Sequence, residues 1–435
     1  MNTFSVSRLA LALAFGVSLS ACSSVPPQDK PSEQSAPGSQ ARPVLSADEA
    51  KNFVPAHYFA SMNPQDPPWT PANIATPAKA DFVVGPAGTA GVTQTSIQAA
   101  VDAAIARHSE RRLYIAVMPG NYQEAVYIPA APGSLTLYGT GEKASDVKIG
   151  LALDAQMDVT TWRKTINPAG QFMPGKSAWY MYQNCLNHHT ATIGIMCSAA
   201  VWSQNNGLQL QNLTIENTLG DSVDAGNHPA VALRTDGDKV QINNVNILGR
   251  QNTFFVTNSD VQNRMTTTGQ PRTLVTNSYI EGDVDLVSGR GAVVFENTHF
   301  QVVNTRTQQE GYVFAPATLP NLYYGFLAVN SQFDAAGNNV AQLGRAWDLG
   351  TAEGSYIPGQ STNGQVVIRD SVINAGFNTA QPWAASKDAK RPFTGNIGTV
   401  QDKQLVRDLN DVNANRLWEY NNRGIGSKVV TVAQK

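Results

Sequence analysis

The sequence predicts an all-β fold, a single-stranded right-handed parallel β-helix closed at its N-terminal end by one capping helix. Three observations predict it. A pattern of alternating apolar residues recurs every 20 to 40 residues, no helical periodicity is present between residues 205 and 375, and the one clear amphipathic helix precedes this repeat. A solenoid of this kind consists of coils that each pack only on their neighbours.

The repeat has the form apolar, any, apolar, any, Asn or Asp, any, any, apolar. Its six copies place the polar residue at Asn212, Asn244, Asn277, Asn297, Asn330 and Asp370. Alternation with period two indicates a strand with one buried face in each copy. We expect these polar side chains to form an internal hydrogen-bonded ladder from coil to coil. A β-sandwich or a propeller is the alternative, but both need more tight hairpin turns than the two Asn-Gly pairs of this chain supply.

An apolar stripe predicts the capping helix. Its residues lie at helical spacing and are Ile97, Ala100, Val101, Ala104 and Ile105. Thr95 and Gln98 are suitable for a capping box at the helix start. We expect this helix to cover the open end of the solenoid, where edge strands would otherwise be exposed.

Composition excludes several classes of protein. The chain has 435 residues, of which 42% are hydrophobic and 15% charged, and this balance excludes a disordered chain. Its length exceeds the range in which a single globular core keeps growing. The formal net charge of −2 provides no excess of cations for nucleic acid. The six histidines form no HExxH motif and the three cysteines lack zinc-site spacing, so neither a metal nor an organic cofactor is expected.

The N-terminus predicts export and a membrane anchor. Residues 1–21 contain Arg8 and an apolar run over residues 9–19 that is too short to span a bilayer and is typical of a signal peptide. The run ends in Leu-Ser-Ala before Cys22, which resembles the lipobox of bacterial lipoproteins. The resemblance implies cleavage before Cys22, lipidation of its thiol and, because Ser23 is not Asp, the outer membrane as the destination. The alternative is a secreted protein with a cysteine near the cleavage site.

The rest of the chain divides into a tether and one domain. Residues 22–45 are rich in Ser, Pro and Gln and predict a flexible tether, and residues 46–435 form the β-helix domain. Cys185 and Cys197 are the cysteines that remain, and in an oxidising compartment we expect a disulfide between them, with two reduced thiols as the alternative. His188 and His189 lie between these cysteines, where a solvated loop is expected rather than a metal site.

Three segments contain candidate catalytic residues: residues 249–254 (GRQNTF), 282–289 (GDVDLVSG) and 343–347 (LGRAW). In these segments the sequence resembles the pectin methylesterase (pectinesterase) family, whose fold is the pectin lyase-like right-handed β-helix. Further stretches similar to the family are residues 95–101 (TSIQAAV), 228–234 (HPAVALR) and 418–427 (WEYNNRGIGS). The resemblance extends over roughly residues 80 to 427 and implies hydrolysis of carboxylic esters of a methylated polygalacturonate.

The spacing of Asn252 and Asp285 is informative by itself. Asn252 follows Asn244 by eight residues and Asp285 follows Asn277 by eight, so the two positions are separated by one repeat of 33 residues. They should therefore stack on consecutive coils, about 4.8 Å apart.

The family has two aspartates at this pair of positions, one that attacks the ester carbonyl and one that protonates the departing methanol. The resemblance implies Asp285 as the nucleophile, Arg345 as its partner and Gln251 as a donor to the oxyanion. We further expect Trp347, Phe254 and Asp283 to bind the substrate, with Trp347 offering a flat surface to a sugar ring.

The sequence departs from the family pattern in three places. The acid aspartate is replaced by Asn252, the first glutamine by Pro229, and the aromatic pair after the nucleophile by Leu286 and Ser288. An amide cannot donate and recover a proton, and loss of a general acid costs about 10²–10⁴-fold for a poor leaving group.

Three functional hypotheses remain open at this point. The chain is a pectinesterase-like hydrolase in which Asp283 replaces the missing acid, or it hydrolyses an acyl thioester, whose thiolate leaves without help. In the third hypothesis it is a non-catalytic, lipid-anchored protein that binds polysaccharide. A capped solenoid is expected to be a monomer in each case.

Overall fold

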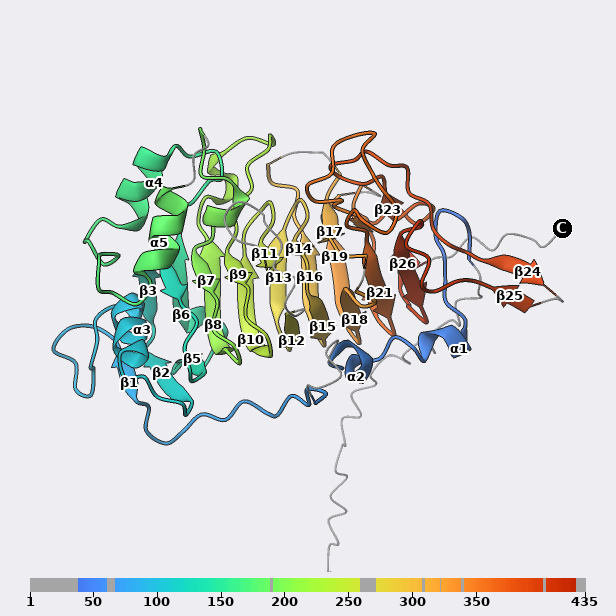
Figure 1. Ribbon diagram of the computed structural model, residues 1–435. Coiled ribbons are helices and arrows are strands. Elements are labelled where there is room, and N and C mark those ends of the chain that lie inside the picture. The colour runs from blue at the N-terminus through green and yellow to red at the C-terminus, as the bar shows by residue number, and fades with distance from the viewer. Residues whose placement is uncertain are drawn as a thin grey trace, which may run out of the picture.

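Parallel strands stack along one axis and line three faces of each coil, which gives the parallel β-helix drawn in Figure 1. The three faces are called the first, second and third sheets below, although the first two are joined by shared strands into one hydrogen-bonded sheet. The computed structural model describes residues 38–60, 67–187, 191–258, 271–306, 310–320, 322–337, 340–401 and 404–427. The signal peptide, Cys22, His188 and His189 lie outside these residues. None of the helices described has the length and apolar character needed to cross a bilayer.

The first sheet runs the whole length of the solenoid. Its strands, in spatial order, are β1 (Phe82–Val84), β2 (Leu113–Val117), β5 (Leu135–Gly139), β8 (Gln209–Asn217), β10 (Val240–Leu248), β12 (Arg272–Thr276), β15 (Ala292–Glu296), β18 (Phe326–Val329), β21 (Gln365–Arg369) and β26 (Arg416–Tyr420). Every neighbouring pair in this order is parallel, as a solenoid requires.

The other two faces of each coil are built in the same way. The second sheet shares the C-terminal halves of β8 and β10 and adds β3 (Gly120–Gln123), β6 (Val147–Leu151), β13 (Tyr279–Gly282), β16 (His299–Val302), β19 (Gln332–Ala335) and β22 (Val372–Ile373). The third consists of β4 (Val126–Ile128), β7 (Val201–Ser203), β9 (Leu233–Thr235), β11 (Phe254–Val256), β14 (Val287–Gly289), β17 (Tyr312–Pro316), β20 (Gln342–Arg345) and β23 (Trp383–Ala384). An antiparallel pair, β24 (Thr399–Gln401) and β25 (Gln404–Val406), projects from the C-terminal end.

The apolar positions of the repeat form the core. One inward-facing row is in register from coil to coil, with every side chain fully buried: Leu210, Ile242, Val275, Phe295, Ala328 and Ile368. Each such side chain stabilises the fold by about 1.5–3 kcal/mol when it is a large aliphatic or aromatic group. The predicted repeat and the predicted stacking are therefore confirmed.

The polar residue of each repeat adopts the left-handed backbone conformation. Its φ lies between 50° and 53° at Asn212, Asn244, Asn277, Asn297, Asn330 and Asp370. Among non-glycine residues, Asn and Asp tolerate this conformation best. The residue turns the chain at the outer edge of the coil, so its side chain faces outward. Asn244 donates to Asn212 (2.9 Å) and Asn297 to Asn277 (2.5 Å), both at exposed sites.

The expectation of an internal Asn ladder is thus wrong, because the internal ladder is formed by the following residue. The buried hydroxyls of Ser278, Ser331 and Ser371 accept backbone N–H groups from the preceding coil at 3.0–3.1 Å. They satisfy amide groups that would otherwise lie unpaired inside the solenoid, which is costly.

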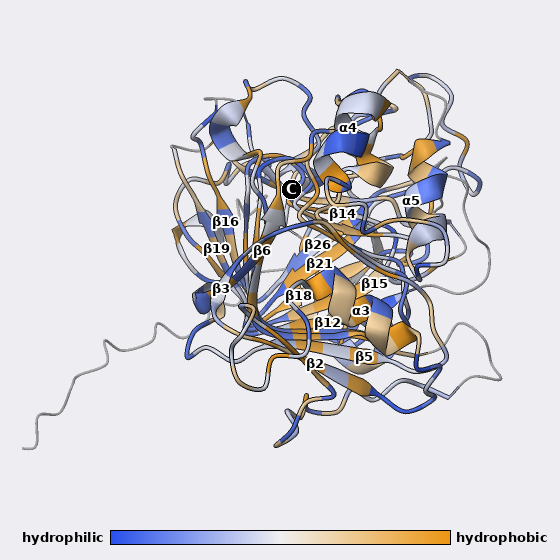
Figure 2. Ribbon diagram, turned by 90° about the vertical axis from the view of Figure 1, so that its left-hand side faces the viewer, coloured by the Kyte–Doolittle hydropathy of each residue, from blue (hydrophilic) through white to orange (hydrophobic). Residues whose placement is uncertain are grey.

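The predicted capping helix is α3 (Ile97–Ile105), which packs on β1, β2 and β4 at the N-terminal end of the solenoid. Figure 2 shows it lying across that end. The predicted capping box is wrong, because the N-cap is Ser96, whose hydroxyl accepts from the N–H of Ala99. The Gln98 side chain instead pairs with both backbone groups of Tyr127.

Two helices that were not predicted from the sequence stand outside the solenoid. They are α4 (Val159–Ile166) and α5 (Trp179–Leu186), and they enclose a separate apolar cluster that includes Trp162 and Tyr182. Cys185 lies in α5 and forms the expected disulfide with Cys197, with a Cα–Cα distance of 5.9 Å.

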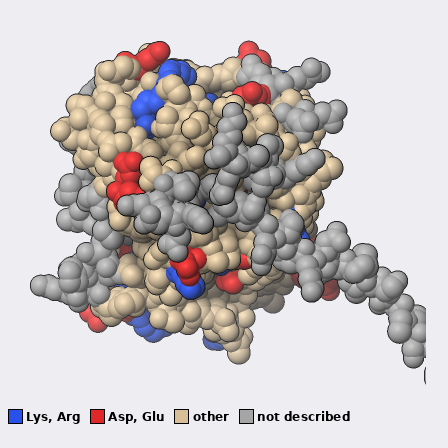
Figure 3. Space-filling model, turned by 90° about the vertical axis from the view of Figure 1, so that its right-hand side faces the viewer, with Lys and Arg blue, Asp and Glu red and all other residues tan. Residues whose placement is uncertain are grey.

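The first described residues close the C-terminal end of the solenoid. Residues 38–45 were expected to belong to the tether, but Val44 forms a parallel bridge with Glu419 of β26 and is fully buried. Arg42 makes two hydrogen bonds to the Glu419 carboxylate, at 2.7 and 2.8 Å, and both side chains are buried. Residues 42–45 therefore belong to the folded domain. Figure 3 shows this end, where the described charges of both signs are scattered.

After this contact the chain turns back toward the N-terminal end of the solenoid. Helices α1 (Ala47–Ala50) and α2 (Pro55–Tyr58) lie beside the strands at the C-terminal end. Residues 67–81 run along the first sheet, where the Gln241 amide donates to the carbonyl of Ala72 at 2.6 Å, and they lead into β1. The N-terminal region thus covers part of the solenoid before the first coil begins.

We expect the substitution Arg42→Met to lower the free energy of unfolding by about 3–5 kcal/mol, since it leaves the Glu419 carboxylate buried and unpaired. Denaturant titration of the purified protein measures this loss. Lys51→Met is the matched control, because Lys51 and its partner Asp48 are 76% and 90% exposed and their pairing should not affect the midpoint. An equal midpoint for Arg42→Met and the wild type would contradict the structural role of the pair.

Candidate active site

The two positions singled out by their spacing lie side by side on consecutive coils. Phe254 pairs with Val287 in the parallel ladder of β11 and β14, and the Asn252 N–H donates to the Val284 carbonyl at 2.9 Å. The ladder therefore aligns Asn252 with Asp285. Both are left-handed, with φ of 59° and 54°, and each precedes a strand of the third sheet. The predicted stacking of these positions is confirmed.

Asp285 is fully buried and contacts two cationic side chains. Arg345, at the end of β20, places Nε 2.9 Å from Oδ1 and Nη2 3.0 Å from Oδ2. Lys387 places Nζ 2.9 Å from Oδ2. The side chains of Arg345 and Lys387 are 15% and 18% exposed, whereas that of Asp285 is 0% exposed. The two cations thus separate the carboxylate from solvent.

Electrostatics keep this carboxylate ionised. Burial raises the pKa of Asp285, but the charges of Arg345 and Lys387 and their hydrogen bonds outweigh burial and lower it to about 2. At neutral pH the carboxylate is therefore ionised, and both cations restrict its movement.

Asn252 is also fully buried, and its amide is incompletely paired. Nδ2 donates to the hydroxyl of Ser288 at 3.0 Å, while Oδ1 has no hydrogen-bond partner among the residues described. Ser288 stands where the family has an aromatic residue, so the two departures from the family pattern contact each other. Neither the Asn252 amide nor the Ser288 hydroxyl is able to act as a general acid.

An open pocket of about 720 Å³ lies beside Asp285 and Arg345. Its lining residues are Ala225, Gly226, Asn227, Gln251, Val284, Glu310, Tyr312 and Arg345. Gln251 donates one of its two amide N–H groups to Asn227 and accepts from the backbone of His228, both at 2.9 Å. The side chain of Gln251 is thus fixed by both of its amide groups at the wall of the pocket. Asn252 and Asp285 lie behind the lining.

Pro229, Gln251 and Val284 are aligned on three successive coils, so Pro229 lies beside Gln251. By the resemblance of the sequence, Pro229 stands in place of the first glutamine of the family. Proline has neither a side-chain donor nor a backbone N–H. One of the two glutamine donors of the family is therefore missing from the pocket.

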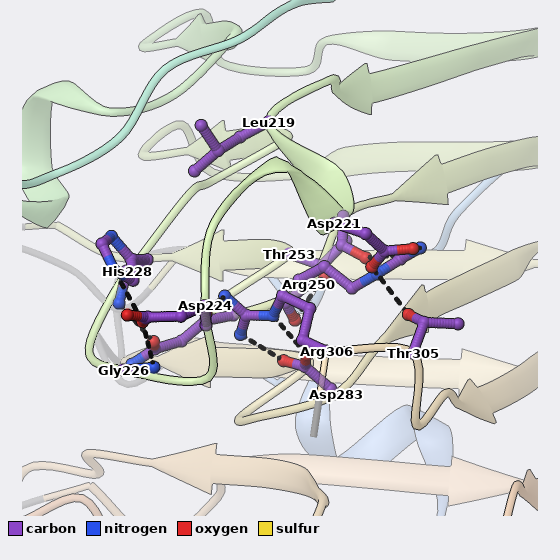
Figure 4. A network of polar contacts seen from close by, with 12 residues as sticks. Leu219, Asp221, Asp224, Gly226, His228, Arg250, Thr253, Asp283, Thr305 and Arg306 are labelled. Atoms are coloured by element: carbon purple, nitrogen blue, oxygen red, sulfur yellow. Dashed lines mark hydrogen bonds and ion pairs between the residues drawn. The ribbon is translucent and has the colours of Figure 1, made fainter.

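Asp283 does not face the pocket as the hypothesis of a substitute acid requires. Arg306 binds both of its carboxylate oxygens, at 2.7 and 2.9 Å, and the two side chains are 4% and 1% exposed. Arg306 also donates to the carbonyl of Asp224 at 3.1 Å. The roles expected for Asp283, as an acid or in substrate binding, are contradicted because its carboxylate is committed to this ion pair (Figure 4).

The same polar network fixes one wall of the pocket. Residues 219–228 form a loop that supplies Ala225, Gly226 and Asn227 to the lining. His228 contacts Asp154 at 2.7 Å and Asp224 at 3.2 Å, and Arg250 contacts Asp221 at 2.6 Å. Figure 4 shows His228, Asp224, Asp221 and Arg250 in this network, so polar contacts join the loop to neighbouring coils.

The two aromatic residues implied in substrate binding are both buried. Phe254 is 0% exposed and packs edge-on against Phe295, because side chains alternate along β11 and its own points into the core. Trp347 is 4% exposed, and the Lys387 ammonium lies 4.7 Å from its ring centroid. Neither ring is open to a sugar. The aromatic ring in the pocket is Tyr312, which lies 3.8 Å from the Arg345 guanidinium carbon.

Lys387 and Tyr312 are the site residues that the sequence did not reveal. Tyr312 lies on the coil after Asp285, where the repeat was too irregular to give its register. Lys387 follows β23 in a loop between the last recognised repeat and the C-terminal motif. No group of three or more His, Cys, Asp or Glu suited to a metal ion is present in the part of the chain that the structure describes.

Comparison with known proteins identifies relatives of this chain. The pectinesterase family model matches residues 183–350. The chain is 69% identical over 436 residues to the Escherichia coli (strain K12) protein named "Putative acyl-CoA thioester hydrolase YbhC", with 100% of both chains covered. It is 47% identical over 432 residues to pectinesterase B of Dickeya dadantii (strain 3937), with 97% of this chain and 98% of the relative covered.

Solved structures give the same result. The rice weevil pectin methyl esterase superposes with a TM-score of 0.79 at 36% identity, covering 91% of this chain and 100% of that chain. A pectin methylesterase in complex with a hexasaccharide gives 0.58 at 20% identity, covering 82% and 92%, and shares the fold. The right-handed parallel β-helix is thereby confirmed. Taken with the identity to pectinesterase B over nearly its whole length, these likenesses show that the chain belongs to the pectinesterase family.

Proposed function

We propose that this chain is a carboxylic ester hydrolase in which Asp285 is the nucleophile. The observation that carries the proposal is the bidentate pairing of Asp285 with Arg345, directly behind an open pocket that Arg345 and Gln251 line. A carboxylate held ionised next to a ligand-sized pocket is suited to attack a carbonyl carbon.

The proposed reaction uses the residues around Asp285 in distinct roles. Oδ1 accepts from Arg345 alone, whereas Oδ2 accepts from both Arg345 and Lys387, so Oδ1 has the freer lone pair. Attack on the ester gives an acyl intermediate that water then hydrolyses. The unused N–H of Gln251 stabilises the oxyanion. Because Asp285 is fully buried, one of its two cations has to move before a substrate reaches it.

The substrate that the relatives favour is a methylated polyuronate. Pectinesterase B of Dickeya dadantii and the rice weevil enzyme both carry names for action on pectin. The pocket is open and polar, with Glu310 and Tyr312 beside Arg345, which suits an extended sugar chain better than an apolar ligand.

A thioester is the second candidate substrate, and Asn252 is the observation that favours it. Without a general acid at this position, a thiolate leaves more readily than an alkoxide, since its conjugate acid has a pKa of about 8.5. The name of the Escherichia coli relative refers to thioester hydrolysis. Assays with an acyl-CoA and with methylated polygalacturonate discriminate between the two substrates.

We also propose that the protein is anchored to the outer membrane through a lipidated Cys22. The support for this is the sequence of residues 19–22, which resembles a lipobox, and Ser23 after it. A multiply acylated cysteine provides durable anchoring where one chain would not.

The substitution Asp285→Asn should lower hydrolysis of the cognate ester by about 10³-fold or more, since the nucleophile is lost. Methanol release from methylated polygalacturonate, or thiol release from an acyl-CoA, measures it. Asp48→Asn, which alters an exposed carboxylate in α1, serves as the control and should hydrolyse normally. If the wild type releases neither product but is retained on immobilised pectin, the protein binds polysaccharide without catalysis.

The contribution of the ionised Asp285 to the free energy of unfolding should decrease as the pH falls. Its folded-state pKa of about 2 lies below the unfolded value of about 3.9, so the stabilisation is present above the unfolded value and is lost as pH falls toward 2. We expect the advantage of the wild type over Asp285→Asn in unfolding free energy to shrink by about 2 kcal/mol between about pH 5 and pH 2. Denaturant titrations across this range test it, and a constant difference would contradict the ion pairing.

A further inference from the structure

The second cation on Asp285 is not needed to neutralise it. Arg345 already donates to both carboxylate oxygens, and Lys387 adds a third donor at 2.9 Å. The loop that carries Lys387 is fixed by backbone hydrogen bonds, from Lys387 to Ala346 at 2.9 Å and from Asp388 to Trp347 at 3.1 Å. These backbone hydrogen bonds therefore hold Lys387 beside Asp285, although no sequence motif identifies this lysine.

The site lacks a proton donor at the place where the family has one. Asn252 carries an amide, and the Asp283 carboxylate is held by Arg306. The Tyr312 hydroxyl donates to Glu310 at 2.8 Å, and burial chiefly raises the pKa of Tyr312 to about 12. Arg345 does not release a proton in proteins. Lys387 is the ammonium that contacts the reacting carboxylate and is also partly exposed toward solvent.

We propose that Lys387 is the general acid that protonates the leaving group, in place of the aspartate that Asn252 replaces. The inference rests on the proposed function of Asp285 as nucleophile. The Lys387 ammonium lies between Asp285 Oδ2, at 2.9 Å, and the Trp347 ring centroid, at 4.7 Å, and its flexible four-carbon side chain allows it to move from Asp285 to the leaving group. The same movement uncovers the carboxylate, so attack and protonation are coupled.

The chemistry balances without any co-reactant other than water. Asp285 Oδ1 bonds to the carbonyl carbon, the carbon–oxygen bond to the leaving group breaks, and that oxygen takes a proton from the Lys387 ammonium. The products are an acyl anhydride on Asp285, an alcohol and a neutral amine. The amine then takes a proton from water as its oxygen attacks the substrate carbonyl, which releases a carboxylic acid and restores both the Asp285 carboxylate and the ammonium.

The proposal is tested by measuring how the effect of a Lys387 substitution on kcat depends on the leaving group of the ester. Lys387→Arg retains a cation beside Asp285 but cannot deliver a proton. We expect it to lower kcat on a methyl ester by about 10²–10⁴-fold, and to lower kcat much less on the 4-nitrophenyl ester of the same acyl group, whose leaving group departs unprotonated at neutral pH. Lys390→Arg, three residues away on an exposed site, is the matched control and should hydrolyse both esters normally.

The outcomes separate the inference from the function on which it rests. Equal losses on both esters, or no loss, would overturn the role of Lys387 as an acid while Asp285→Asn still abolished activity. If Asp388→Asn, rather than Lys387→Arg, lowers kcat more on the methyl ester than on the 4-nitrophenyl ester, the general acid is the Asp388 carboxyl. That result would also overturn the role of Lys387. If the wild type hydrolyses neither ester, the proposed function fails and the inference fails with it.

A rescue experiment adds an independent measurement. Asn252→Asp restores a carboxyl at the position aligned with Asp285, where burial beside another carboxylate raises its pKa and keeps a proton available. In the Lys387→Arg background, this substitution should recover methyl ester hydrolysis by about 10-fold or more, within the range of a general acid. No recovery, in a double variant with the wild-type denaturation midpoint, would show that proton donation is not what Lys387→Arg removes.

Discussion

The left-handed backbone conformation at the corners of the coils is the constraint on which this structure depends. It recurs at the Asn and Asp positions of the repeat and again at Asn252 and Asp285. Because Asn and Asp tolerate this conformation nearly equally, an Asn at 252 keeps the bend of the coil while it removes a titratable proton. The scaffold therefore accepts the change without strain, and the chemistry of the site alone is altered.

The candidate nucleophile combines two opposing effects. Burial disfavours its charge, while Arg345 and Lys387 restore the charge and lower its pKa to about 2. The same cations cover the carboxylate, so the resting site is protected from solvent but closed to a substrate. A lysine resolves this conflict better than a second arginine would, because its flexible stem moves at low cost and its ammonium exchanges a proton. Arg345 thus stabilises the Asp285 carboxylate in the resting site, whereas Lys387 moves during the proposed reaction.

Much of the fold follows from the sequence, but less of the site does. The alternation around Asn244 and Asn277 fixes strands, register and core, since burial repeats from coil to coil. The alignment of Asn252 with Asp285 follows from that spacing. The ion pair of Asp283 with Arg306 does not, since Arg306 lies in a loop whose position no repeat determines. The position of Lys387 does not follow from the sequence either, because its loop follows a coil of irregular length. The burial of Trp347, which the Lys387 ammonium contacts, was not predicted for the same reason.

The contact of residues 42–45 with β26 joins the two ends of the polypeptide. During synthesis on a ribosome, the segment that emerges first has to wait for residue 419 before Arg42 finds its carboxylate. The coils between them are able to form in order as they emerge, because each needs only its predecessor. Completion of the last coil is therefore a long-range event, and until β26 has formed, the outermost strand of a nascent chain lacks its covering segment and is open to pairing with another molecule.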